Sequence, residues 1–273
     1  MGEVIRRDKK ALVVSIYFLL LTVWWITLQF TGNFRQFQLD VFTISYGYVA
    51  LFGGIWGLLT ARKWGGFKSL IGRAVIAFSF GLLAQELGQL IYTYFIYFKG
   101  VEVPYPSWGD LGFFGSIPLY IYGTVLLAKA SGIRAVIRAF SGKLQALFIP
   151  LIALAFSSYV FLQGYEVDWT NPLRVFLDFG YPIGQAIYLS IALLTYLLSY
   201  NSLGGIMRGK ILFILGALFV QYIADFIFLY QASRGTCAVS CISDYIYFVA
   251  YFLMALSLLQ LNRVMTQFKT GEV

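Results

Sequence analysis

Long runs of apolar residues follow one another along the chain, and short polar stretches with most of the charge separate them. At 1.5 Å per residue, about twenty apolar residues in a helix cross a hydrocarbon core of roughly 30 Å. The runs predict eight membrane-spanning helices, at 11–30, 41–61, 74–98, 111–128, 144–162, 175–198, 211–230 and 245–261. We therefore expect an all-α, polytopic helical bundle in which 1–273 form a single membrane domain.

The composition supports a lipid environment. Of the 273 residues, 60% are hydrophobic and 12% are charged, which is more apolar surface than a water-soluble globule of this length could bury. The first apolar run has the full length of a span, and no small-residue cleavage site follows it. We expect a signal anchor there, not a cleaved signal peptide. We expect no soluble domain beside the spans.

Basic residues concentrate on one side of the predicted bundle, and the net charge is +8. Only Arg35, Lys99, Arg174 and Arg234 fall on the other side. The remaining sixteen are Arg6, Arg7, Lys9, Lys10, Arg62, Lys63, Lys68, Arg73, Lys129, Arg134, Arg138, Lys143, Arg208, Lys210, Arg263 and Lys269. The positive-inside rule then predicts a cell-membrane protein with both termini in the cytoplasm. The surplus positive charge orients the chain in the lipid bilayer, and we expect no nucleic acid partner.

Matching positions in the two halves of the chain predict an internal duplication. Val41-Phe42 and Val175-Phe176 open corresponding spans 134 residues apart, and Asp110 and Asp244 share this separation. Gln85 and Gln221 are 136 residues apart, as are Gln89 and Asp225. Apolar sequences can resemble one another by composition alone, but several of these positions are polar. The halves would be 1–138 and 139–273, and four spans in each half give a parallel 4+4 repeat.

Polar side chains within the spans are the candidate binding residues. A carboxylate at the centre of a span costs about 2.5–3.5 kcal/mol, so such groups usually face the bundle interior or water. Glu86 with Gln85 and Gln89, and Gln221 with Asp225, lie on the third predicted span of each half. The acids are biased toward the outer side, which predicts an outward-facing polar pocket. The candidate ligand-binding residues are Gln85, Glu86, Gln89, Asp110, Asp178, Gln221, Asp225 and Asp244.

Two alternatives remain open for these residues. Each acid can instead bond only to the Tyr, Ser, Thr and Gln side chains that are frequent in the spans. Asp110 and Asp244 can also cap helices, because each opens a span directly after a loop.

The two cysteines, Cys237 and Cys241, lie in the last predicted outer loop. We expect a local disulfide between them, because that compartment allows disulfides to persist. The chain has no histidine, so a structural zinc site lacks its usual ligands. The sequence assigns no metal and no other cofactor.

The segment 81–123 resembles a known family. It joins a polar span to a loop containing Pro106, Ser107 and Asp110, followed by a span containing Pro118-Leu119. This pattern is similar to the Pro-Ser-x-Ala-Asp loop of multi-span membrane sensor domains that precede histidine kinases or diguanylate cyclases in bacteria and archaea. Gly109 replaces the alanine, and we expect no kinase or cyclase domain after the spans. The resemblance implies a stand-alone sensory or ligand-responsive membrane module.

Two functions fit these features. The first is signal transduction by a sensory, ligand-binding module that acts through a membrane or cytoplasmic effector protein. The alternative is transport of a cation or small polar solute along a path lined by Glu86 and Asp225. An enzyme is less favoured, because without histidine the usual general base and its Ser or Cys pairs are missing. The ligand expected in either case is a small molecule or a cation.

Overall fold

The computed structural model describes residues 8–31, 36–101, 103–131, 169–199, 206–234 and 241–270, with scattered positions from 148 to 167. Within this part of the chain the secondary structure is helical, without strands. The long helices are α2 (Lys9–Thr31), α3 (Gln36–Lys63), α4 (Leu70–Thr93), α5 (Gly109–Ala130), α8 (Pro172–Ser199), α9 (Ile206–Arg234) and α10 (Ile242–Thr270). A 3₁₀ turn, Gly66–Lys68, precedes α4, and a π-helix, Tyr94–Lys99, continues it.

Seven helices in the described ranges are long and apolar enough to cross a membrane. They coincide with seven of the eight predicted spans, which confirms the all-α class and agrees with a multi-pass membrane protein. The predicted span 144–162 lies outside the described residues, apart from scattered positions that are helical.

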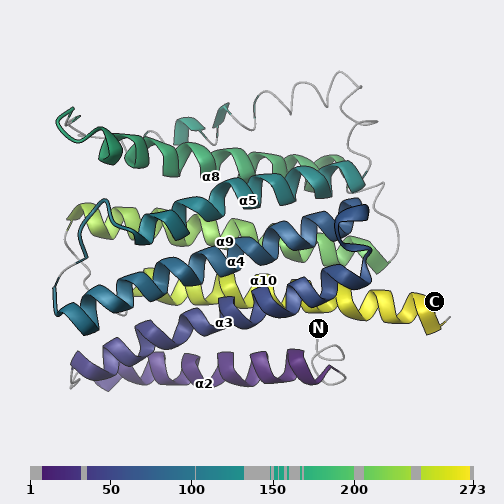
Figure 1. Ribbon diagram of the computed structural model, residues 1–273, viewed down its shortest axis with the longest axis horizontal. Helices are drawn as coiled ribbons and strands as arrows, with labels where there is room; N and C mark the ends of the chain where they lie inside the picture. Colours follow the sequence, from purple (N-terminus) through teal and green to yellow (C-terminus); the bar gives the residue numbers. More distant parts are fainter. Residues whose placement is uncertain are drawn as a thin grey trace.

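Helix contacts close into a ring. Each helix contacts the next in the order α3, α4, α5, α8, α9 and α10, and α10 contacts α3. α2 packs outside the ring against α3 and α10. The helices lie side by side along the longest axis of the molecule (Figure 1). The ring interior is therefore lined by six helices.

Two neighbouring pairs in the ring are parallel. Along α3 and α10, the rings of Tyr46 and Tyr251 stack at 6.0 Å near one end. Near the other end, Trp64 Nε1 donates to the carbonyl of Leu261 at 3.0 Å. Along α5 and α8, Phe114 meets Tyr181 at 5.3 Å and Tyr120 meets Tyr188 at 6.1 Å. We call the end where α5 and α10 begin the Trp108 end, and the opposite one the Trp64 end.

Small residues allow close approach at both parallel pairs. Gly53 and Gly57 of α3 face Ala255 and Leu258 of α10. Gly180 and Gly184 of α8 likewise face Phe114 and Ile117 of α5. A side chain at any of the four glycines would overlap these neighbours, so each pair keeps two helices in contact, as small-xxx-small pairs do in membrane proteins.

The outer surface of the bundle is apolar. Leu19, Leu20 and Val23 of α2 are 59%, 65% and 63% exposed. At the Trp108 end, Trp108 and Trp169 are 74% and 76% exposed, as expected of aromatic residues at a membrane interface. A surface of this kind fits a hydrocarbon environment and would be an aggregation liability in water.

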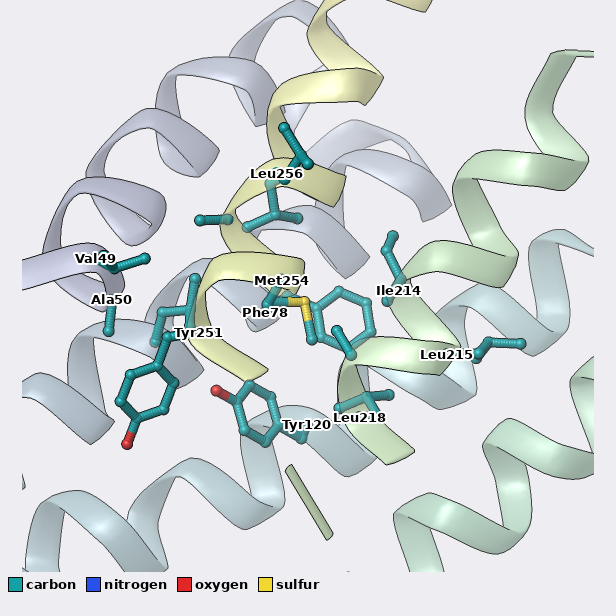
Figure 2. Packing of buried hydrophobic residues seen from close by; sticks show 14 of the residues in the cluster. Val49, Ala50, Phe78, Tyr120, Ile214, Leu215, Leu218, Tyr251, Met254 and Leu256 are labelled. Carbon is teal, nitrogen blue, oxygen red and sulfur yellow. The ribbon is translucent and has the colours of Figure 1, made fainter. Parts of the chain in front are cut away.

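An apolar layer fills the ring interior toward the Trp64 end. We use this name for Phe78, Leu82, Ile214, Leu218, Met254 and Leu256, which are at most 3% exposed. Phe78 lies seven residues before Gln85 on α4, which places it about 10 Å nearer to the Trp64 end. In Figure 2, Tyr120 and Tyr251 lie at one edge of this layer, and the Tyr251 hydroxyl points away from Leu256.

The α4–α5 contact gives a test of the packing. A Cβ at Gly112 would overlap the backbone of Ala84 and Gly88, whereas one at Gly115 meets nothing within 4 Å. We expect Gly112→Ala to destabilise the protein by about 1–3 kcal/mol because backbone cannot yield. Gly115→Ala should be neutral or raise stability slightly, because alanine favours helices. Thermal unfolding in detergent micelles measures both, and equal midpoints for the two variants would contradict the packing.

Candidate functional site

Polar side chains that join the helices of the ring by hydrogen bonds lie in the half nearest the Trp108 end. Ser116 is seven residues from the start of α5, and Tyr251 is nine residues from the start of α10. Gln89 is four residues from the end of α4. Each is almost completely buried, and the Gln85 and Gln221 side chains are buried with them. Burial of such groups is tolerable only where they find partners inside the protein.

Gln85 joins α4 to two other helices. Its Nε2 donates to Ser116 Oγ of α5 at 2.7 Å, and its Oε1 accepts from the Tyr251 hydroxyl of α10 at 3.0 Å. Ser116 in turn donates to the carbonyl of Phe113 at 2.7 Å. Both ends of the buried amide are therefore bonded.

Gln89 makes the equivalent connection to α3. Its Oε1 accepts from the Tyr46 hydroxyl at 3.1 Å, and its Nε2 donates to the backbone carbonyl of Thr43 at 2.9 Å. The ring of Tyr46 also stacks on Tyr251. The two glutamines of α4 are thus linked through a pair of stacked tyrosines.

Asp225 of α9 is surrounded by donors. Tyr247 of α10 donates to Oδ1 at 2.7 Å, and Tyr188 of α8 donates to Oδ2 at 3.5 Å. Gln221 Nε2, one turn earlier on α9, lies 3.3 Å from Oδ1. Hydrogen bonds from these three donors offset part of the cost of an ionised carboxyl group at this position.

Glu86 differs from Asp225 although both are acids in the same half. Glu86 is 3% exposed, and its Oε2 has no hydrogen-bond partner among the described residues. It lies against Gly47 of α3, where a Cβ would overlap the carboxyl group. One residue of helix turns the side chain by about 100°, so Glu86 faces α3 while Gln85 faces α5 and α10.

Asp110 and Asp244 lie in the first turns of α5 and α10. Asp110 Oδ2 accepts from the backbone N–H of Ser107 at 2.7 Å, and Asp244 Oδ2 accepts from that of Cys241 at 3.1 Å. Each carboxylate therefore satisfies an N–H three residues earlier, which is the back-bonding half of a capping box. Asp110 has a second partner, because the Tyr181 hydroxyl of α8 donates to its Oδ1 at 2.8 Å.

Asp178 lies near the start of α8, apart from the buried glutamines. It accepts from the Tyr105 hydroxyl at 2.7 Å, and Arg174 Nε lies 3.7 Å from Oδ2. The pKa of Tyr105 is raised above its ordinary value, mainly by burial and secondly by the hydrogen bond to Asp178. The phenol therefore keeps its proton and remains a donor. The loop before α5 is thereby fastened to α8, and Arg174 supplies a cation to one of the predicted acids.

The eight predicted residues therefore form several separate arrangements. Gln85 and Gln89 are linked through Tyr46 and Tyr251, Gln221 contacts Asp225, and Asp110, Asp178 and Asp244 lie at helix starts. The partners of the buried groups are tyrosines that the sequence reasoning did not place in the site. We call the set Tyr46, Tyr188, Tyr247, Tyr251, Gln85, Gln89 and Asp225 the tyrosine network. A usable signal was the spacing of Tyr247 and Tyr251, which puts both rings on one face of α10.

The remaining chemistry is limited. Cys241 is in a disulfide, and Cys237 lies outside the described residues. Over the described ranges, no group of three or more acidic or cysteine residues is placed to hold a metal ion. A groove of about 480 Å³ lies on the bundle surface, lined by Ile152, Phe156, Leu189, Leu193, Phe219, Tyr222, Ile223 and Phe226. Its lining is mainly apolar and contains no residue of the tyrosine network.

No protein-family model, curated protein or solved structure matches this chain. Its function therefore has to be argued from the site itself.

The Asp225 cluster gives a second test. Tyr247→Phe removes the shortest hydrogen bond to the partly buried carboxyl group of Asp225, and we expect a loss of about 1–2 kcal/mol in stability. Tyr122→Phe removes a hydroxyl from a tyrosine that is 48% exposed and should change stability little. Thermal unfolding in detergent micelles compares the two. A loss at Tyr247→Phe no greater than at Tyr122→Phe would show that the hydroxyl does not hold Asp225.

Proposed function

We propose that this protein is a sensory, ligand-binding membrane module with an outward-facing polar site formed by the tyrosine network. The observation that carries the proposal is the division of the ring interior. Side-chain hydrogen bonds that join one helix to another lie toward the Trp108 end, whereas the apolar layer lies toward the Trp64 end. Buried hydroxyls at the level of the apolar layer, such as Ser79 and Thr124, bond to carbonyls of their own helix. A small polar ligand would enter from the Trp108 end and meet Asp225, the amides and the phenols.

The division favours sensing over continuous conduction. A permeation path needs polar or hydrated groups along its length, because an ion in hydrocarbon is costly. Phe78, Leu218 and Leu256 interrupt the interior with close-packed apolar side chains. A ligand held above them would act by shifting helices, and the change would pass by contact to a partner protein. The resemblance of segment 81–123 to membrane sensor domains supports this interpretation.

We further propose that the chain has eight spans in two parallel halves, with the Trp108 end outward. Two features support the repeat. α3 and α8 each carry a glycine pair that faces the last helix of the opposite half, α10 or α5. Asp110 and Asp244 make the same backbone contact 134 residues apart. The two glycine pairs are 127 residues apart, whereas the aspartates are 134 apart. The pairs therefore lie on equivalent helices but differ in position along them by about two turns. The positive-inside asymmetry supports the orientation.

A transporter is the second candidate. Glu86 favours it, because a buried carboxyl group without a hydrogen-bond donor on Oε2 is a feature of proton and cation carriers. A parallel repeat is also found among transporters, whose substrate sites lie near the membrane midplane. Transport would require the apolar layer to open during the cycle.

Liposomes distinguish the two functions. We expect vesicles containing the protein to show no protein-dependent flux of protons, Na⁺ or K⁺, read with entrapped dyes, and no difference from vesicles with Glu86→Gln or Asp225→Asn. Flux that requires Glu86 or Asp225 would overturn the sensor proposal in favour of a transporter.

A ligand screen provides the matching positive test. We expect one class of small polar solute, from a panel of organic cations, zwitterions and anions, to raise the unfolding temperature saturably. A ligand at 100 times its dissociation constant adds about 2.7 kcal/mol to stability. Asp225→Asn should abolish the effect, and Tyr122→Phe should preserve it. A rise that survives Asp225→Asn unchanged would place binding outside the tyrosine network.

A further inference from the structure

The Glu86 carboxyl group lies at the α3–α4 contact and takes no part in the tyrosine network described above. It packs against Gly47, with the Cγ of Gln89 beside the same glycine. Its neighbours on α4 are engaged elsewhere: Gln85 with Ser116 and Tyr251, and Gln89 with Tyr46 and Thr43. The Oε2 atom is enclosed and has no hydrogen-bond partner among the described residues.

No described basic side chain is placed to neutralise an ionised Glu86. The groups that interact with it electrostatically are phenols: Tyr17 from α2, Tyr46 from α3 and Tyr251 from α10. Tyr17 already donates its proton to the carbonyl of Ser45 at 2.8 Å. The nearest basic residues along α4 and its π-helical extension, Arg73 and Lys99, are thirteen residues away on either side, or roughly 20 Å.

If Glu86 binds a proton, its carboxyl group is neutral and needs no basic partner. An ionised group in an apolar environment without a counter-charge is strongly disfavoured, and binding a proton removes the charge. A metal ion is a weaker solution, because hard divalent cations take about six or more oxygen ligands. Over the described residues, no group of three or more acidic or cysteine side chains is placed to form such a site. The adjacent amide oxygen of Gln89 already accepts from Tyr46.

We propose that Glu86 is a proton-binding site between α3 and α4, separate from the Asp225 cluster and occupied by a proton at neutral pH. The two acids then have different roles in one bundle. Asp225 accepts hydrogen bonds from three donors, whereas Glu86 Oε2 has none among the described residues and Glu86 binds the proton. Release of that proton would place an unpaired negative charge against Gly47 and push α3 and α4 apart.

Infrared spectroscopy of the full-length protein in phosphatidylcholine vesicles tests the proposal directly. A protonated carboxyl group has a C=O stretching band that is separate from the carboxylate bands. We expect this band at pH 7 in the wild type and in Asp225→Asn, and its loss in Glu86→Gln. A wild-type spectrum that shows no band depending on Glu86 would overturn the proposal. Conversion of the band to a carboxylate by NaCl at constant pH would also overturn it, because a metal cation would then be the ligand.

Stability provides a second measurement that does not depend on the band. If Glu86 is neutral in the folded protein, Glu86→Gln replaces it with a neutral group of nearly the same shape and should fold. Thermal stability of the wild type should fall as pH rises from 6 to 9, because the folded state binds a proton that the unfolded state releases. The loss should be absent in Glu86→Gln and present in Asp225→Asn. An unchanged pH dependence in Glu86→Gln, or failure of that variant to fold, would show that an ionised Glu86 is required.

Discussion

The cost of an unpartnered polar group in an apolar interior is the constraint on which this structure depends. A buried amide or carboxyl group must find its donors and acceptors on other helices, because lipid offers none. Tyrosines meet this need here, since each has a large apolar ring and a hydroxyl that both donates and accepts. Tyr251 reaches Gln85 on α4, Tyr46 reaches Gln89 from α3, and Tyr247 and Tyr188 reach Asp225 on α9. These bonds connect helices that are far apart in the sequence.

The same constraint explains why the polar groups occupy only part of the ring interior. Where no hydrogen-bonding group is present, Leu, Phe and Met side chains pack in the apolar layer, and glycines bring the parallel helices close together. The polar half is therefore the place where a ligand could exchange its hydrogen bonds with those of the protein. Glu86 Oε2 and Gln185 Oε1 are buried in this half without a hydrogen-bond partner among the described residues, and of these two groups the carboxyl of Glu86 is the one that can take up a proton.

The sequence predicted the helices well because the length of an apolar run is set by the membrane thickness alone. The observed α3, Gln36–Lys63, contains the predicted 41–61, and α5, Gly109–Ala130, contains 111–128. Helix faces were harder to predict. Gln85 and Glu86 were both candidate binding residues, but adjacent residues differ by about 100° around a helix, and the two contact different neighbours. Which helix lies opposite each face is a property of the tertiary packing and cannot be read from periodicity.

The partners of the buried acids were also beyond the sequence. Twenty tyrosines are spread over the chain, and periodicity does not tell which of them face inward. Tyr105 illustrates the difficulty: nothing in its loop position indicates that it donates to Asp178 on α8. The capping role of Asp110 and Asp244 was accessible, because a carboxylate just after a loop has a local partner that does not depend on tertiary contacts.

A double-mutant cycle across the ring tests most directly whether the tyrosine network is a set of mutually satisfied groups. Gln85→Leu and Tyr251→Phe are made singly and together, and the free energy of unfolding is measured by sodium dodecyl sulfate titration in mixed micelles. Each single change leaves one buried partner unsatisfied, whereas the double change removes both, so the double variant should be more stable than the sum predicts by about 1 kcal/mol or more. Additivity within about 0.3 kcal/mol would contradict the account, because the hydroxyl and the amide would not then depend on each other.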